Sequence, residues 1–190
     1  MLASRSPQRR AILEQLGIPF RALAPDVSEL DAGDPAAVVA ENALAKARAV
    51  EGQTVLGADT AVVLDGHIHG KPAGAREARE WLGLLSGRWH EVWSGIALRR
   101  AGVERSASEL TRVRFRALGA AEIDWYVASG EWRERAGGYA IQGRGAALVE
   151  RIEGDFWNVV GLPVSRLLTL APELVTGATP SVSASAGASR

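Results

Sequence analysis

Helix-like and strand-like hydrophobic patterns alternate along this chain, and that alternation limits its fold more than any other feature. Apolar residues three or four positions apart predict helices, and short apolar runs bounded by turn residues predict strands. Their alternation favours an α/β fold over a helical bundle or a β-sandwich. With 190 residues, the chain is long enough for one compact domain or two closely packed lobes.

Local signals set the limits of the expected helices. In the first helix, Ser6 can cap the amino end, Pro7 suits the first helical position and Gly17 can close the helix. The apolar face of a second helix, at residues 35–50, should consist of Val38, Val39, Leu44 and Ala45. Further helices are expected at residues 75–87, at residues 119–131 and at the end of residues 158–174.

Strand-like runs separate these helices. The pair Asp65-Gly66 should form the tight turn of a hairpin, and the segment 101–104 should join two later strands. The runs themselves are residues 54–59, 61–70, 90–100, 106–118 and 143–155.

Composition narrows the classes of function. The 22 Lys and Arg residues balance the 22 Asp and Glu residues, so no net charge attracts nucleic acid or an anionic membrane. Cysteine is absent, which excludes disulfides, thiolate metal sites and a cysteine nucleophile. No signal peptide or membrane-spanning apolar run is recognisable, so a soluble protein of the cytoplasm is expected. The Ser-, Ala- and Gly-rich residues 176–190 should be a disordered tail behind a domain at residues 1–175.

The segment "SRSPQRR", residues 4–10, places hydroxyl and guanidinium groups at the start of the first helix. The unpaired N–H groups and the dipole of a helix amino end favour an anion. Arg5, Arg9 and Arg10 would destabilise this positive end unless an anion offset them. The segment therefore predicts a phosphate site, and the alternative is an ordinary basic helix start on the surface.

Asp59 directly follows an apolar run and should stand at the carboxyl end of a strand. Sheets of α/β proteins usually bind their ligands at that end. A carboxylate there could bind a divalent cation or orient a water. The alternative is an aspartate that caps a turn before Thr60.

Three other charged residues are candidates for a phosphate-binding site, and the local sequence supports them unequally. Lys71 stands before a proline, which places a point charge on a rigid extended segment suited to neutralising a phosphate. Glu29 and Lys46, taken singly, look like an ordinary loop carboxylate and an ordinary solvated helix lysine.

Imidazole and indole side chains give weaker signals. His67 and His69 should be surface residues of the hairpin and His90 should begin a strand, because their spacing lacks a third metal ligand. The tryptophans are mostly explained by packing, although Trp89 or Trp93 could stack on a base.

The segment "RERAGGYAIQGRGA", residues 133–146, is the most unusual in the chain. Its glycines allow the backbone to approach a ligand closely. Gln142 offers an amide with both a donor and an acceptor, which can read the edge of a nucleobase. A glycine-rich bulge or hairpin without a ligand is the alternative.

Taken together, these segments resemble the Maf family of nucleoside triphosphate pyrophosphatases. The resemblance runs from Leu2 to about Leu170 through the motifs "LASRSPQRRAILEQLGIPF", "ENALAKA", "LGADTAVVLDG" with "GKP", "LSGRWHEVWSGIAL", "SGEWRERAGGYAIQGRGAALVERIEGD" and "NVVGLP". It implies hydrolysis of a nucleoside triphosphate to the monophosphate and pyrophosphate with a divalent cation, magnesium or manganese. It also implies an elongated mixed β-sheet with flanking helices and two lobes around a deep cleft, as in the inosine-triphosphate pyrophosphatases.

Within the family, Gly-Ala-Asp-Thr and Ala-Gly-Gly-Tyr-x-Ile-Gln-Gly are similar to the motifs of the branch that acts on dTTP and UTP. By this resemblance Asp59 is the proton acceptor and, with Glu29, a metal ligand. The residues implied at the phosphate and metal site are Ser4, Arg9, Glu29, Lys46 and Lys71. Thr60 and Gln142 are implied in the choice of base, and the role is nucleotide housecleaning.

Gln8 departs from the family pattern, which usually has two arginines after Ser-Pro. The position is associated with substrate specificity, so a pyrophosphatase with purine preference is an alternative. A nucleotide-binding regulator of cell division is another, because the family was once described as septum-formation inhibitors. A nucleic-acid-binding module using Arg5–Arg10 and Arg112–Arg116 is a third, which the zero net charge disfavours.

Two expectations concern the molecule as a whole. Relatives commonly carry several apolar residues before the segment "MLAS", so the start of the natural chain is expected further upstream. A homodimer is compatible with the sequence because dimers are common among soluble enzymes, although no sequence feature specifies one.

Overall fold

The computed structural model describes residues 1–177 and contains a mixed seven-stranded sheet. The strand order is β2-β1-β3-β5-β6-β7, and β4 pairs with β3 outside that path. β1 is parallel to β2 and β3, and the other neighbouring strands are antiparallel. The strands are β1 (Leu2–Ala3), β2 (Ala22–Leu23), β3 (Thr54–Leu64), β4 (His67–His69), β5 (Trp89–Arg100), β6 (Val103–Phe115) and β7 (Val149–Glu153).

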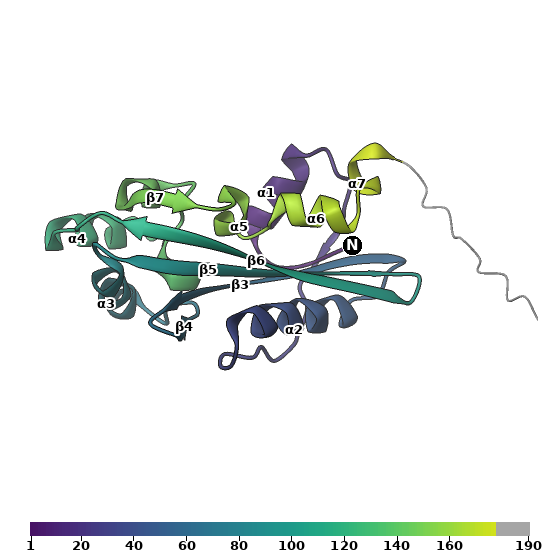
Figure 1. The fold of residues 1–190 in the computed structure, drawn as a ribbon, viewed down its shortest axis with the longest axis horizontal. Helices are drawn as coiled ribbons and strands as arrows, with labels where there is room; N and C mark the ends of the chain where they lie inside the picture. Colours follow the sequence, from purple (N-terminus) through teal and green to yellow (C-terminus); the bar gives the residue numbers. More distant parts are fainter. Residues whose placement is uncertain (178–190) are drawn as a thin grey trace, which may run out of the picture.

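Helices flank this sheet on both faces. Figure 1 shows α2 on one side of the long strands, α1 and α6 on the other, and α3 and α4 towards the far end. The helices are α1 (Pro7–Gln15), α2 (Pro35–Arg48), α3 (Ala75–Leu85), α4 (Ala120–Ala128), α5 (Phe156–Val160), α6 (Val164–Leu170) and α7 (Glu173–Thr176), with 3₁₀ turns at Ala136–Gly138 and Arg144–Leu148. The predicted α/β class, an elongated mixed sheet with flanking helices, is confirmed.

Local capping explains where the first two helices begin. Ser6 Oγ accepts the N–H of Arg9 at 3.4 Å, and Pro7 is the first helical residue, as predicted. Asp34 Oδ1 accepts the N–H of Ala37 at 2.9 Å in the same way at the start of α2. A side-chain acceptor at this position satisfies a backbone donor that the helix itself leaves unpaired.

The predicted hairpin between β3 and β4 is confirmed. Asp65 and Gly66 have φ values of 52° and 77°, and a two-residue turn of type I′ needs positive φ at both central positions. The turn between β5 and β6 follows the same rule, with Ala101 at 46° and Gly102 at 81°.

The predicted break in the strand next to Asp59 is wrong. β3 continues without interruption from Thr54 to Leu64, because its partner β5 pairs with it from Arg100 to Glu91. Asp59 lies opposite Gly95 in this ladder. It therefore stands in the middle of a strand and not at its carboxyl end.

The strand predicted at residues 143–155 is only partly correct. Residues Arg144–Leu148 form a 3₁₀ turn, and the strand starts at Val149. Distant groups hold the turn: Arg116 Nε donates to Ala147 O at 2.8 Å, and Glu131 Oε2 accepts from Arg144 N at 2.7 Å. Neither contact can be read from the local sequence.

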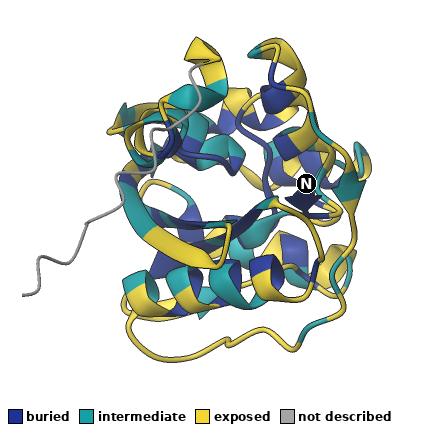
Figure 2. Cartoon of the chain, turned by 90° about the vertical axis from the view of Figure 1, so that its right-hand side faces the viewer, coloured by how far each residue is buried: buried dark blue, intermediate teal, exposed yellow. Residues whose placement is uncertain are grey.

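The apolar face of α2 also differs from the prediction. Val38 and Val39 are buried as expected, but Leu44 and Ala45 are only partly buried. The other buried positions of the helix are Asn42, Ala43, Lys46 and Ala47. The buried face thus carries two polar side chains into the protein, and Figure 2 shows this face of α2 turned to the sheet and its outer face exposed.

Hydrophobic packing divides into two main clusters along the sheet. One includes Leu82, Phe115 and Tyr126, and the other includes Leu13 and Leu167. These clusters correspond to the two expected lobes. Among the described helices, none has both the length and the apolar character needed to cross a membrane. α7 ends at Thr176, where the tail was expected to begin, and from residue 178 onward that expectation lies outside the described residues.

Candidate active site

Two glycines set the distance between α2 and the sheet. A Cβ atom at Gly57 of β3 would overlap the carbonyl oxygen of Ala43, and one at Gly95 of β5 would overlap that of Val39. The helix backbone therefore lies directly on the strands, where no side chain separates them. At this distance Asn42 and Lys46, one helical turn apart on α2, both reach Asp59.

Lys46 joins the two predicted metal-binding carboxylates. Its Nζ lies 2.6 Å from Asp59 Oδ1 and 2.8 Å from Glu29 Oε1. The Lys46 and Asp59 side chains are 8% and 11% exposed, whereas Glu29 is 48% exposed. The remaining oxygen of Asp59, Oδ2, accepts a hydrogen bond from Asn42 Nδ2 at 2.9 Å. Both oxygens of Asp59 therefore have fixed donors.

Arg9 enters the same region from α1 and is almost completely buried. Its Nε donates to Gly161 O at 2.8 Å, Nη1 donates to Ser4 Oγ at 3.2 Å, and Nη2 donates to Thr60 Oγ1 at 3.0 Å. Burial lowers the pKa of Arg9, and the nearby carboxylates of Asp59 and Glu29 oppose that shift. The guanidinium is thus held in one orientation before any ligand binds.

Thr60, whose predicted part in the choice of base stays a prediction, lines the cavity and accepts the hydrogen bond from Arg9. Its Oγ1 also lies 2.9 Å from Ser94 Oγ, and Ser94 Oγ donates to Asn158 O at 3.1 Å. Ser94 and Asn158 are fully buried. This chain of hydrogen bonds links α1, β3, β5 and α5, and it holds the Arg9 guanidinium in place through Thr60.

A cavity of about 650 Å³ opens above these groups. All of the predicted site residues line it: Ser4, Gln8, Arg9, Glu29, Lys46, Asp59, Thr60, Lys71 and Gln142. Apolar walls come from residues of the two hydrophobic clusters, including Val62 on β3, Tyr139 and Val160 at the end of α5. The charged residues Arg9, Lys46 and Asp59 lie on one part of the cavity wall, and apolar residues form another part. Such a cavity suits a ligand that has both a polyphosphate and a base.

The outer rim of the cavity is less constrained. Lys71 Nζ lies 2.8 Å from Glu134 Oε2, and both side chains are largely exposed. Gln142 is exposed, and within residues 1–177 its carboxamide has no hydrogen-bond partner. Gln8 Oε1 accepts a hydrogen bond from Ser6 Oγ at 3.1 Å. Lys71 and Gln142 can therefore turn towards a ligand without breaking buried contacts.

The histidines and tryptophans considered as candidates, His67, His90, Trp89 and Trp93, do not line the cavity. His67 is exposed on the hairpin, and His90 Nε2 lies 2.9 Å from the hydroxyl of Tyr139 inside one hydrophobic cluster. Neither Trp89 nor Trp93 lines the cavity. Trp89 packs under the Arg112 guanidinium at 4.7 Å, and Trp93 donates to Glu91, so the suggested stacking on a base is wrong.

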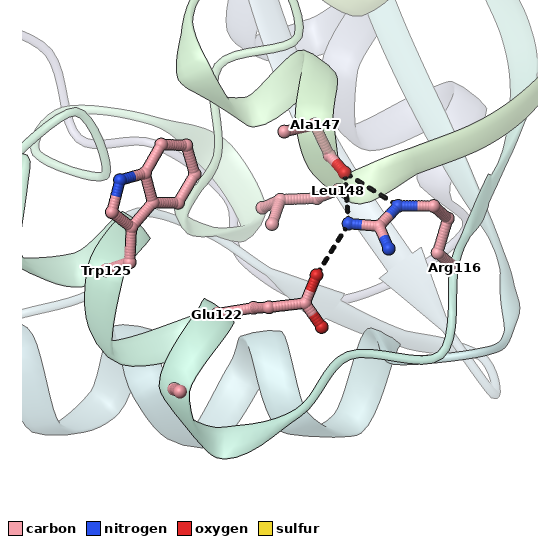
Figure 3. A pocket seen from close by; sticks show the side chains of 6 residues that line it. Arg116, Glu122, Trp125, Ala147 and Leu148 are labelled. Atoms are coloured by element: carbon pink, nitrogen blue, oxygen red, sulfur yellow. Dashed lines mark hydrogen bonds and ion pairs between the residues drawn. The ribbon is translucent and has the colours of Figure 1, made fainter.

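A second, smaller pocket of about 340 Å³ lies at the far end of the molecule. Figure 3 shows Arg116 at its edge, bound to Ala147 O and to Glu122, with Trp125 on the opposite wall. None of the predicted site residues lines it.

Sequence reasoning missed Asn42, Ser94 and Asn158. A signal existed for Asn42: it precedes Lys46 by four residues in "ENALAKA", which places both on one helix face. Ser94 and Asn158 gave no local signal, because their contacts join segments far apart in the chain.

The chain is similar to known proteins over most of its length. The family model described as Maf-like protein matches residues 1–174. A dTTP/UTP pyrophosphatase of Symbiobacterium thermophilum is 51% identical over 176 residues, covering 90% of this chain and 91% of the relative. A protein of the same name from Thermus thermophilus is 49% identical over 172 residues, covering 90% and 91%. The chain therefore belongs to the Maf-like protein family.

Proposed function

We propose that this protein is a nucleoside triphosphate pyrophosphatase that hydrolyses dTTP and UTP to the monophosphate and pyrophosphate. The observation that carries the proposal is the meeting of Asp59, Lys46 and Glu29 with the buried Arg9 guanidinium in one cavity. The names of the relatives supply the substrates. Such an enzyme would remove surplus or modified nucleotides before a polymerase uses them.

The phosphates of the substrate are proposed to lie against the start of α1. Arg9 and Ser4 face this part of the cavity, and Lys46 and Lys71 bring two further positive charges to it. Fixed positive groups that meet charge as it develops in the transition state lower the barrier. Because Arg9 is already held by Gly161, Ser4 and Thr60, little reorganisation is needed when a phosphate arrives.

Asp59 is proposed to be the proton acceptor for the attacking water. Lys46 and Asn42 hold its two oxygens, so its orientation in the cavity is fixed. A water within hydrogen-bonding reach of Asp59 would attack the α-phosphorus as its proton passes to the carboxylate. The P–O bond to the β-phosphate then breaks, and pyrophosphate leaves in line with the incoming oxygen.

We further propose that two carboxylates of the cavity help to bind a divalent cation together with the substrate. Magnesium in nucleotide sites is usually bound by one or two carboxylates together with the phosphates of the substrate. Asp59 and Glu29 are both paired with Lys46 and could supply these carboxylates. Oxygen ligands suit magnesium and manganese almost equally, so either ion is compatible with the site. Such an ion would neutralise charge on the phosphate oxygens.

Gln142 is proposed to read the base. Its carboxamide lines the cavity and has no hydrogen-bond partner among residues 1–177, and an amide can match the acceptor and donor groups on the imide edge of uracil or thymine. Cytosine reverses part of that pattern. Gln8 also lines the cavity, and it is the reason why a purine preference is kept as the second candidate.

A nucleic-acid-binding surface on the Arg112–Arg116 segment gains little support from the structure. Each arginine of the segment is paired with a carboxylate: Arg112 with Glu153, Arg114 with Glu150 and Arg116 with Glu122. These arginines are therefore already neutralised, which disfavours binding of a phosphate backbone.

We further propose that residues 1–175 form one catalytic domain and that the protein acts in the cytoplasm as a homodimer. Sedimentation of the purified protein would test the oligomeric state.

The deciding experiment measures pyrophosphate release from dTTP, UTP, CTP, GTP, 7-methyl-GTP and ITP with magnesium or manganese. We expect turnover of dTTP and UTP, and a loss of roughly a hundredfold or more in kcat for Asp59→Asn. A purine preference would assign the specificity to Gln8. Binding without turnover in the wild type would favour the regulator, and a fully active Asp59→Asn would exclude Asp59 as the proton acceptor.

A further inference from the structure

Asn42 makes an unusual set of contacts for a helix residue. Its Oδ1 accepts the N–H of Leu30 at 2.7 Å, while its Nδ2 donates to Leu30 O at 2.9 Å and to Asp59 Oδ2 at 2.9 Å. The residue as a whole is 3% exposed. One carboxamide thus uses both of its N–H groups and its oxygen to join a backbone segment to the central carboxylate of the site.

The segment that Asn42 grips is otherwise weakly attached. Residues 25–33, here called the Glu29 loop, connect β2 to the Asp34 cap of α2 and contain no helix or strand. Among residues 1–177, the only hydrogen bonds and ion pairs that reach this loop are those from Asn42 to Leu30 and from Lys46 to Glu29. Leu30 is 55% exposed, so its backbone is held by Asn42 and not by burial of its side chain.

The Glu29 loop matters because it forms one wall of the cavity. Pro25, Asp26, Val27 and Glu29 all line it. If the loop left this position, Glu29 would move away from Lys46 and the wall would open. A protein that spends only part of its time in the binding-competent state binds its ligand more weakly in proportion to that fraction.

We propose that Asn42 is a positioning residue that locks the Glu29 loop to Asp59, so that both carboxylates are in place before the substrate binds. This inference rests on the proposed function, because it concerns the same cavity. Lys46 alone cannot do this, since its long side chain grips only the exposed tip of Glu29, whereas Asn42 fixes the backbone of the next residue. Asn42 is itself neither the proposed proton acceptor nor a proposed metal ligand, and it acts by holding Asp59 and the Glu29 loop in place.

Asn42→Leu tests the lock, because leucine has a similar volume and none of the three hydrogen bonds. The amide proton of Leu30 should exchange with solvent faster in this variant than in the wild type, as hydrogen exchange measures. The KM for dTTP should rise about tenfold, because a tenfold change in affinity corresponds to the free energy of about one lost hydrogen bond. The kcat should fall by less than the KM rises, because Lys46 still holds Asp59.

A double-mutant cycle with Glu29→Gln separates positioning from general destabilisation. If Asn42 acts through the Glu29 loop, its replacement should change the KM by less than about twofold when Glu29 is already altered. Glu41→Gln, at an exposed neighbouring position on α2, is the matched control and should behave as the wild type. Equal KM effects of Asn42→Leu in both backgrounds would overturn the proposal.

A second variant covers the case in which leucine is not tolerated. Asn42→Ala removes the same three hydrogen bonds without placing a branched side chain in the site, so the same rise in KM and in exchange rate is expected. Unchanged exchange of the Leu30 amide in the folded variants would overturn the proposal. If the wild type hydrolysed no triphosphate, the pyrophosphatase proposal would fail, and Leu30 exchange would still decide whether Asn42 locks the loop.

Discussion

Lys46 and Asp59 form the most deeply buried ion pair of the described residues, with Nζ 2.6 Å from Oδ1 and both side chains about one-tenth exposed or less. Breaking a buried pair leaves an uncompensated charge, which typically costs 3–5 kcal/mol. Lys46→Met should therefore lower the free energy of unfolding by about 3 kcal/mol, as urea titration measures. Lys71→Met is the control, because the Lys71–Glu134 pair is exposed and such pairs contribute about 1 kcal/mol or less. Equal losses in the two variants would mean that the Lys46 pair is as solvent-screened as that of Lys71.

The contact of α2 with the sheet predicts the effect of a single methyl group. Gly95→Ala would place Cβ against the carbonyl oxygen of Val39 and push α2 outwards, at a cost of about 1–3 kcal/mol. Because α2 carries Asn42 and Lys46, kcat should fall together with stability. Gly83→Ala, in an exposed part of α3 with open space around it, should stabilise the protein by roughly 0.5–1 kcal/mol. An active, stable Gly95→Ala variant would contradict this account of the helix position.

Gln142→Leu removes the free amide from the cavity at nearly constant volume. If the amide pairs with the base, kcat/KM for UTP should fall at least tenfold, because the imide edge then loses its partner. Most of the change should appear in KM, which steady-state pyrophosphate release measures. Gln15→Leu, at an exposed position outside the cavity, should leave both constants unchanged. Retention of full UTP activity by Gln142→Leu would move base recognition elsewhere in the cavity.

His90 predicts how stability depends on pH. Burial lowers its pKa from 6.5 to about 3, so the folded protein keeps His90 neutral while the unfolded chain takes up a proton below pH 6.5. Stability contributed by neutral His90 is therefore present above pH 6.5 and is lost as the pH falls towards 3, by about 1.4 kcal/mol per unit. His90→Gln should remove this slope in urea titrations at several pH values. The exposed His67→Gln should keep it, and an unchanged slope in His90→Gln would assign the acid sensitivity to other groups.

Much of the fold could be predicted because it depends on short-range signals. Ser6 and Pro7 begin α1, and Asp65 with Gly66 turns the chain between β3 and β4; each depends on the conformational preferences of a few neighbouring residues. The continuous strand through Asp59 could not be predicted in this way, because its length is set by pairing with β5. The local sequence favoured an end of the strand at Asp59, but hydrogen bonding to β5 extends the strand beyond this residue.

The candidate site shows the same division. The site residues came from motifs of the family, and they all line one cavity, although their catalytic roles remain predictions. The interactions that hold them were not foreseen. Asn42 acts on Leu30 and Asp59, and Thr60 acts on Arg9, so their contacts exist only once distant segments meet.

The long strands of the sheet have a mechanical consequence for the cavity. β3 and β5 carry residues of both hydrophobic clusters, Val62 and Leu56 on β3, and Val92 and Leu98 on β5. Their hydrogen-bonded ladder runs unbroken from one cluster to the other. The two ends cannot move apart without bending this continuous pair of strands, so admission and release of a ligand depend on the exposed side chains at the rim, such as Lys71 and Gln142.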